Sequence, residues 1–240
     1  MVSEGIDSNP LLVGMSTQEP PVKVSVYPDL NDLTKCSSFY LPPSLLKEKS
    51  EYFRGALSGK LMESEVSEVK LVDVHPKAVK MFVEWLYLRK LHIQDADTQP
   101  VFVDGDFMRA YQLADRLLCP EACKNEIMNS LQELHLRRGF HPIDLGQAYT
   151  NSLPDSLPWR YLIHHVASDL TDVDLYKHFT TYQAWNHLPC GVVRPLFTEF
   201  HKLCVGSLKE ETAKDPARQT GCRWQVHTNK KESKCRNPCS

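Results

Sequence analysis

The side chains that could carry out chemistry in this chain are its cysteines and histidines. Four of them near the C-terminus are potential zinc ligands: Cys222, His227, Cys235 and Cys239. Their spacing lacks the short paired knuckles that usually preorganise a tetrahedral zinc site. The sequence therefore predicts no metal centre.

Catalysis by a nucleophile finds no support either. A catalytic cysteine needs a nearby base and a third group that orients it, and no signature supplies them around Cys119 or Cys190. Both cysteines stand beside proline or glycine at expected helix ends, where packing of a small side chain explains them. His164 and His165 point about 100° apart on a helix and cannot share one site, so we expect one to be buried and the other exposed to water.

Phosphate-binding loops are also missing, because Gly55 and Gly59 are isolated and neither follows a strand in a nucleotide-binding pattern. The sequence thus favours a protein that is not an enzyme, with no cofactor and no small-molecule substrate.

The composition places the chain among soluble globular proteins of the cytoplasm or nucleus. Of its 240 residues, 42% are hydrophobic and 24% are charged, and the formal net charge is -2. No apolar run approaches the roughly 18 residues of a membrane span, and the start MVSEGIDSNP has no signal-peptide pattern. Neither a membrane nor nucleic acid is an expected partner of the chain as a whole. Without a secretion signal, the eight cysteines are expected to be reduced.

Alternating apolar residues predict a small sheet. VKVSVY directs Val22, Val24 and Val26 to one face, and TKCSSFYL follows after a turn, which predicts a hairpin. A third strand is expected in SEVKLVDV, with Val69 and Leu71 pointing inward.

Helical spacing dominates the rest of the first half. PSLLKEKS and EYFRGALS read as two short helices, the second capped by Ser50 and ended by Gly59. HPKAVKMFVEWLYLRK is apolar nearly all round and is expected in the core. DFMRAYQLADRLL, capped by Asp106, and PEACKNEIMNSLQELHLRR predict a helical hairpin. The expected buried faces are Phe107, Ala110, Tyr111, Ala114 and Leu118 in the first and Cys123, Ile127, Leu131 and Leu134 in the second.

Further helices are expected in HPIDLGQAYTNS, PWRYLIHHVASDL and VVRPLFTEFHKLCVGS, packed against Leu131 and its neighbours. Their apolar faces are Tyr161, Leu162, His165, Val166 and Leu170, then Val193, Leu196, Phe197, Phe200 and Leu203. The tail after residue 206 has eight Lys or Arg against four acids and few aliphatic residues, which favours disorder.

Several elements, in order, resemble a BTB/POZ domain of the short stand-alone kind found in fungi. They are SEYFRGALSGKLMES, VKLVDVHPKAVKMFVEWLYLRKL and FMRAYQLADRLLCPEACKNEIMNSL. The resemblance implies an α+β fold, a helical cluster flanked by a small sheet, used for protein-protein interaction. The core positions that it implies are Tyr52, Phe53, Phe82, Trp85, Leu86, Tyr87, Leu113 and Ala114. The chain departs from the family pattern at Pro42-Pro43, at His75-Pro76 and in lacking a glycine after Tyr87.

The resemblance also bears on the apolar residues before the third strand. Family members that serve as substrate adaptors for cullin-type ubiquitin ligases offer a hydrophobic residue, any residue and then Glu at this point. Leu61-Met62-Glu63 matches that pattern, which makes these residues a predicted partner-binding site. The alternative is that Leu61 packs beneath the domain while Glu63 caps or pairs locally.

The expected organisation is a flexible leader at residues 1–20, a BTB/POZ domain at 21–138, a helical extension at 139–206 and a basic tail at 207–240. Expected partners are proteins, with a cullin scaffold or a second copy of the chain as candidates. The alternative function is a nuclear regulator whose tail, densest at Lys230-Lys231, contacts nucleic acid.

Overall fold

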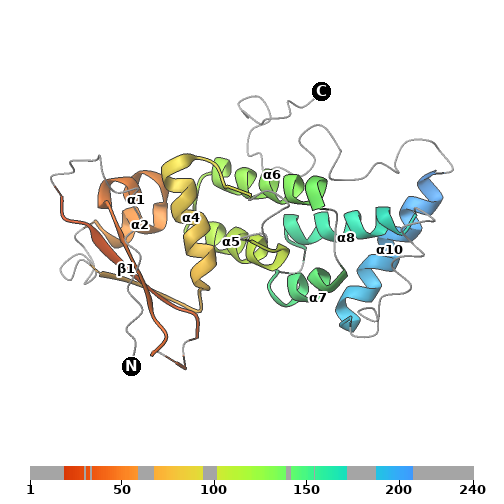
Figure 1. Ribbon diagram of the computed structural model, residues 1–240, viewed down its shortest axis with the longest axis horizontal. Helices are drawn as coiled ribbons and strands as arrows, with labels where there is room; N and C mark the ends of the chain where they lie inside the picture. Colours follow the sequence, from red (N-terminus) through yellow and green to blue (C-terminus); the bar gives the residue numbers. More distant parts are fainter. Residues whose placement is uncertain are drawn as a thin grey trace.

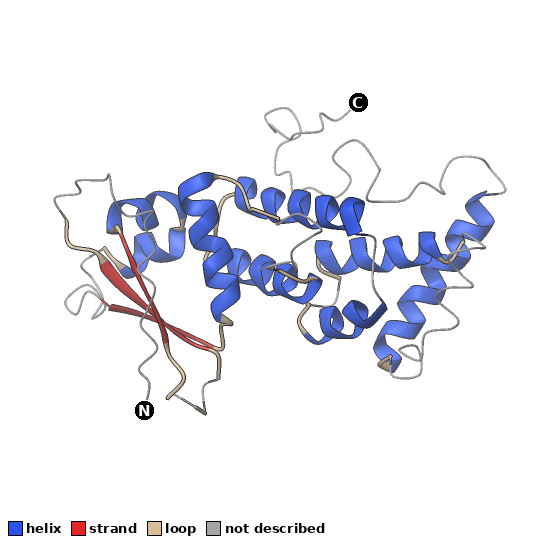
Figure 2. Ribbon diagram, in the orientation of Figure 1, coloured by secondary structure: helices blue, strands red, loops and turns tan. Residues whose placement is uncertain are grey.

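The computed structural model describes residues 19–29, 31–32, 34–58, 68–93, 102–138, 142–153, 155–171 and 188–207. The molecule is elongated, with the sheet at one end and helix α10 at the other (Figure 1). Strands are confined to that first end and helices fill the remainder (Figure 2). The α+β class, with a mainly helical extension after the sheet-containing part, is confirmed.

The sheet has the order β2-β1-β3, from β1 (Val22–Tyr27), β2 (Ser37–Leu41) and β3 (Glu68–Val72). β1 pairs antiparallel with β2, which confirms the hairpin, and parallel with β3. Val24 faces Val69 and Val26 faces Leu71 across the parallel pair, and all four are at most 1% exposed. The apolar face predicted in both strands is therefore confirmed, but Ser25 on the opposite face of β1 is also buried, with its Oγ donating to Glu68 at 2.6 Å.

Helices α1 (Pro43–Lys49), α2 (Glu51–Ala56) and α4 (Pro76–Leu88) pack beside the sheet. Pro43 occupies the first turn of α1, where its missing N–H has no helical partner to lose. Ser50 caps α2 as predicted, with its Oγ accepting a hydrogen bond from the Phe53 N–H at 3.2 Å. Gly59 lies outside the described residues.

Helices α5 (Asp104–Arg116) and α6 (Glu121–Arg138) form the predicted hairpin. The prediction that Asp106 caps α5 is wrong, because the helix begins at Asp104 and Val103 is the N-cap. Asp106 instead lies in the first turn, and its carboxylate accepts the Val103 N–H at 3.2 Å. Leu118, predicted on the buried face, lies beyond the helix end with a positive φ of 50° and is 58% exposed.

The extension comprises α7 (Pro142–Thr150), α8 (Leu157–Asp169) and α10 (Cys190–Ser207). α7 contacts α5, and α10 packs along α8. α6 also contacts α8 through His135, which lies one helical turn after Leu131. The predicted face of α10 is partly wrong: Val192, Leu196 and Leu203 are buried, whereas Val193 and Phe197 are 38% and 65% exposed. In the described part of the chain, no helix has the length and apolar character to cross a membrane.

Candidate functional site

The predicted contact residues Leu61, Met62 and Glu63 lie outside the described residues, but the structure describes the elements on both sides of them. The segment leaves α2 at Leu57, which is 8% exposed, and returns in β3, where Val69 is 1% exposed. Both ends of the segment are thus fixed in the core.

The α2 end is held by Ser50, which links it to the end of α5. Besides accepting from Phe53, the Ser50 hydroxyl donates a 2.6 Å hydrogen bond to the Leu117 carbonyl. The N–H of Tyr52 also donates to Leu117 O, at 3.4 Å. Because Ser50 is 1% exposed, water cannot replace these bonds.

A line of rings joins α2 to the central helix α4. The Phe53 ring stacks on Phe82 at 6.2 Å between centroids, and Phe82 stacks on Trp85 at 6.4 Å. At the far end, the Arg89 guanidinium lies 4.8 Å from the Trp85 ring centroid, an arrangement typical of a cation-π contact. α2 and α4 therefore form one packed unit.

Most of the core positions implied by the resemblance are buried. Six of them are at most 5% exposed: Phe53, Phe82, Trp85, Leu86, Leu113 and Ala114. Tyr52 and Tyr87 are half-buried and pack against this core. The Tyr87 hydroxyl has no hydrogen-bond partner among the described residues, and burial raises its pKa, so it remains protonated.

A buried polar cluster joins the first half of the chain to the extension. The side chains of Asp104 in α5 and His135 in α6 are both 0% exposed, with Oδ1 and Nε2 3.1 Å apart. The other ring nitrogen of His135 lies 3.0 Å from the Tyr161 hydroxyl of α8, and the His135 ring stacks on His165 at 4.8 Å. If Asp104 is ionised it can only accept, so the Nε2–H then donates to it.

This cluster was missed by sequence reasoning, although a signal existed. His135 follows Ile127 and Leu131 at helical spacing, so a polar side chain interrupts the apolar face of α6. An acid and an imidazole in contact are also the parts of a general base. Here both histidine nitrogens are occupied within the core, and Tyr161 is 0% exposed. The arrangement is therefore suited to fixing the angle between α5, α6 and α8.

A polar hollow of about 410 Å³ lies beside the start of α4 and the end of α7. Its ionisable side chains hold structural elements in place: His75 Nδ1 accepts the Lys77 N–H at 3.3 Å and caps α4. Arg109 bonds to Asp106 and to Asn151, and Arg116 donates to the Val72 carbonyl.

The surroundings of His75 in this hollow lower its pKa. Burial lowers its pKa first, and the positive charges of Arg109 and Lys77 lower it further, against the opposing effect of Asp106. The neutral imidazole that results is the form that can accept the cap hydrogen bond.

The histidine pair in α8 differs from the prediction. Both His164 and His165 are buried, at 2% and 3% exposure, because α10 covers the side of α8 that was expected to face water. His164 Nδ1 lies 2.7 Å from Glu199 Oε1 of α10, whereas His165 stacks on His135. The two rings thus have different partners, as the 100° separation requires.

Glu199 anchors α10 to α8. Burial pushes its pKa upward, but hydrogen bonds from His164 and Lys202 outweigh burial and leave the pKa lowered. Glu199 is consequently ionised near neutral pH.

Two of the described cysteines lie side by side in the core. Cys119 and Cys123 are free thiols at 7% and 1% exposure. The hydrogen bond with Cys119, followed by burial, raises the pKa of Cys123 well above that of an ordinary thiol, which keeps it protonated. Across the described ranges, no cluster of metal-ligating residues occurs. The zinc candidates Cys222, His227, Cys235 and Cys239 and the basic tail lie outside them.

Comparison with known proteins agrees with this geometry. Residues 36–126 match the family model of the BTB/POZ domain. A stretch of 123 residues is 25% identical to Kelch-like protein 21 of Rattus norvegicus, Mus musculus and Homo sapiens. That stretch is 51% of this chain and 19% of each relative, so the likeness covers about a fifth of those proteins.

Proposed function

Since the chain carries a BTB/POZ domain, we propose that it is a non-enzymatic adaptor that joins a protein partner to a cullin-type ubiquitin ligase scaffold. The observation that carries the proposal is the family match over residues 36–126, which contain the packed unit of α2 and α4. Protein-interaction use of such a domain needs a rigid frame and an apolar anchor rather than an ionisable cleft. We place this activity in the cytoplasm or the nucleus.

In this proposal, Leu61 is the anchor that enters a pocket of the cullin, and Glu63 lies at the rim of the contact. Full burial of a leucine side chain contributes about 1.5–3 kcal/mol. A rim carboxylate adds orientation and association rate more than affinity. The support for this assignment is the position of Leu61-Met62-Glu63 between two anchored elements, α2 and β3.

The test is co-elution of the full chain with a purified cullin N-terminal domain in size-exclusion chromatography. The test variant combines Leu61→Ala with Glu63→Gln. The chain offers a matched control, because Leu153 and Asp155 repeat the apolar-x-acid pattern on an exposed turn. Leu153→Ala with Asp155→Asn keeps the same change in size and charge.

We expect the wild type and the control variant to co-elute with the cullin and the test variant to elute separately. Circular dichroism verifies that both variants are folded. The absence of a complex with wild type, or equal complexes with both variants, sinks the cullin assignment. Light scattering on the same column gives the mass of the free chain and so decides whether it associates with itself.

A further inference from the structure

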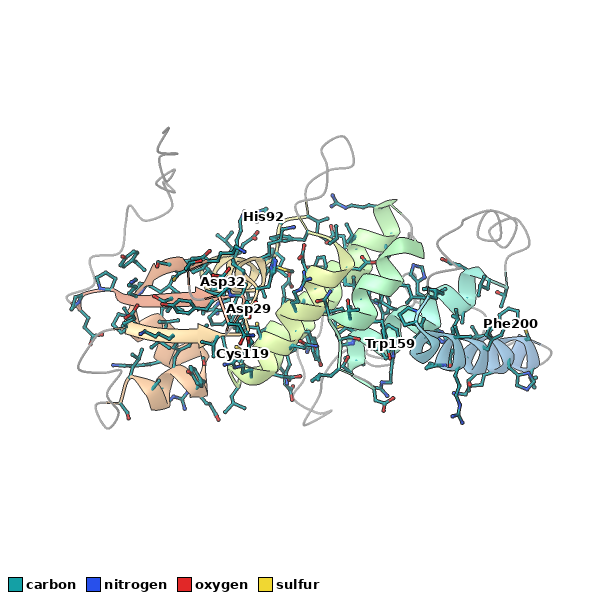
Figure 3. The ribbon with its side chains drawn as sticks, turned by 90° about the horizontal axis from the view of Figure 1, so that it is seen from below. Asp29, Asp32, His92, Cys119, Trp159 and Phe200 are labelled. Atoms are coloured by element: carbon teal, nitrogen blue, oxygen red, sulfur yellow. The ribbon has the colours of Figure 1, made fainter. Side chains whose placement is uncertain are left out.

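A groove of about 640 Å³ runs between α8 and α10, at the end of the molecule farthest from the sheet. Apolar walls come from Trp159 and Ile163 of α8 and Pro195 of α10. Figure 3 shows Trp159 beside α10. Trp159 is 5% exposed and Ile163 is 6% exposed, so the walls belong to the packed core and are rigid.

The rims of this groove are cationic. Arg160 of α8 and Arg194 and Lys202 of α10 contribute the positive charges. Lys202 already forms an ion pair within the protein, since its Nζ lies 3.1 Å from Glu199 Oε2. Arg160 and Arg194 are exposed, and neither guanidinium group makes a hydrogen bond or an ion pair with any described residue. Each guanidinium group can therefore form a bidentate pair with an incoming carboxylate.

The negative charge within the groove does not neutralise these arginines. Glu199 is shared by His164 at 2.7 Å and Lys202 at 3.1 Å, so its charge is already balanced. Asp155 is the other acid of the lining, on the turn before α8, and its side chain forms no ion pair within the described chain. Two unpaired cations thus face one unpaired acid.

A second hollow of about 620 Å³ adjoins the groove and shares Arg194 and Thr198 with it. Val193 and Phe197 line it, at 38% and 65% exposure. Arg194 and Thr198 lie one helical turn apart, and Val193 and Phe197 form the neighbouring row of the same helix. α10 therefore presents an apolar row and a cationic row side by side.

We propose that the groove between α8 and α10 is a docking site for an acidic amphipathic helix of a protein partner. Its apolar face packs on Val193 and Phe197, and its carboxylates pair with Arg160 and Arg194. Charge complementarity and the adjoining apolar row both favour such a helix over nucleic acid, whose bases and phosphates supply no aliphatic face. The inference rests on the adaptor function proposed above and assigns its recruiting surface to the end of the molecule opposite the sheet.

The span of the site sets the length of the occupant. From Val193 to Lys202 the helix advances about 14 Å at 1.5 Å per residue. A bound helix of about twelve residues, roughly 18 Å long, covers that distance. Its affinity depends on salt, because both arginines are exposed to solvent and an ionic atmosphere of about 10 Å screens them at 0.1 M.

The test measures fluorescence anisotropy of a labelled, end-blocked twelve-residue peptide with leucines at helical spacing and glutamates elsewhere. The full chain is titrated into this peptide and into a second one in which lysine replaces every glutamate. The test variant is Arg160→Glu with Arg194→Glu. The matched control is Lys70→Glu with Lys80→Glu, which changes the net charge equally at two exposed cations near the sheet.

We expect saturable binding of the glutamate peptide by the wild type and by the control variant, and at least tenfold weaker binding by the test variant. Phe197→Ala is expected to weaken binding by about fivefold without altering its salt dependence. Equal binding of the two peptides, equal affinity of test and control variants, or no binding by wild type overturns the proposal. Binding of a single-stranded RNA of twelve nucleotides in place of the peptide also overturns it.

The two proposals fail independently. The Arg160→Glu, Arg194→Glu variant is expected to retain the cullin, and the Leu61→Ala, Glu63→Gln variant is expected to retain the peptide. Loss of both ligands in either variant would contradict the assignment of two separate surfaces, and thermal melts show whether unfolding is the cause.

Discussion

Replacing Ser50 tests how α2, which precedes the predicted contact residues in the sequence, is held against the end of α5. The hydroxyl accepts from Phe53 N at 3.2 Å and donates to Leu117 O at 2.6 Å, at 1% exposure. Loss of an N-cap costs about 1 kcal/mol. Loss of a buried hydrogen bond costs about another 1 kcal/mol, limited here because Tyr52 N–H still donates to the same carbonyl. Ser50→Ala is therefore expected to lower the free energy of unfolding by about 2 kcal/mol, a factor of about 30 in the folded-to-unfolded ratio.

Two further replacements separate the two functions of Ser50. Glycine is a tolerable N-cap, so Ser50→Gly mainly removes the bond to Leu117 and is expected to cost about 1 kcal/mol. Aspartate is a good N-cap that cannot donate, so Ser50→Asp places a buried carboxylate against the Leu117 carbonyl and is expected to cost more than Ser50→Ala. Urea denaturation monitored by circular dichroism measures all three variants, with Ser58→Ala at an exposed position as control. A Ser50→Asp variant as stable as wild type would refute the bond to α5.

Three other predictions concern the core, the buried cluster and the cap of α4. Phe82→Ala is expected to cost about 3–5 kcal/mol in urea denaturation, because it removes a ring that is 5% exposed; a cost below about 1 kcal/mol contradicts its core position. His135→Ala removes the imidazole 3.1 Å from buried Asp104 and is expected to cost about 3–5 kcal/mol, part of which Asp104→Asn restores in a double-mutant cycle. His75 has a pKa below the ordinary 6.5, so its contribution to stability is complete above pH 6.5 and is lost as the pH falls through the folded-state pKa. His75→Asp keeps an ionised cap, so its stability relative to wild type should rise between pH 7 and pH 5; a constant difference contradicts the cap to Lys77.

The regular elements were predictable because their signals are local. Val22, Val24 and Val26 share one buried face because successive side chains of a pleated strand point to opposite sides. Ser50 was recognised as an N-cap because its hydroxyl acts within three residues of itself. The central helix was placed in the core because few of its positions are polar, and Trp85 is indeed 2% exposed.

The errors fall where the outcome depends on a distant partner. His164 looked like a residue that could face water until α10 packed over it and supplied Glu199. In the packed helix α10, Val192 is buried and Phe197 is exposed. The sequence periodicity alone is compatible with either residue facing the core. The start of α5 was misplaced because Asp106 is a good cap by type, yet it acts from the first turn on the N–H of Val103.

The buried cluster needed the tertiary structure altogether. The bond from His135 to Asp104 spans 31 residues and the bond to Tyr161 spans 26, so no local pattern indicates either partner. The cationic groove is of the same kind, because Arg160 and Arg194 come together only when α8 and α10 pack.

Isothermal titration calorimetry of the full chain with a cullin N-terminal domain tests the adaptor assignment most directly. The account predicts saturable binding by the wild type and by the Leu153→Ala, Asp155→Asn control, with at least a hundredfold weaker binding by Leu61→Ala with Glu63→Gln, about 2.7 kcal/mol. A wild type that gives no binding, or a Leu61→Ala, Glu63→Gln variant that binds as tightly as wild type, contradicts the claim that this domain engages a cullin through the segment between α2 and β3.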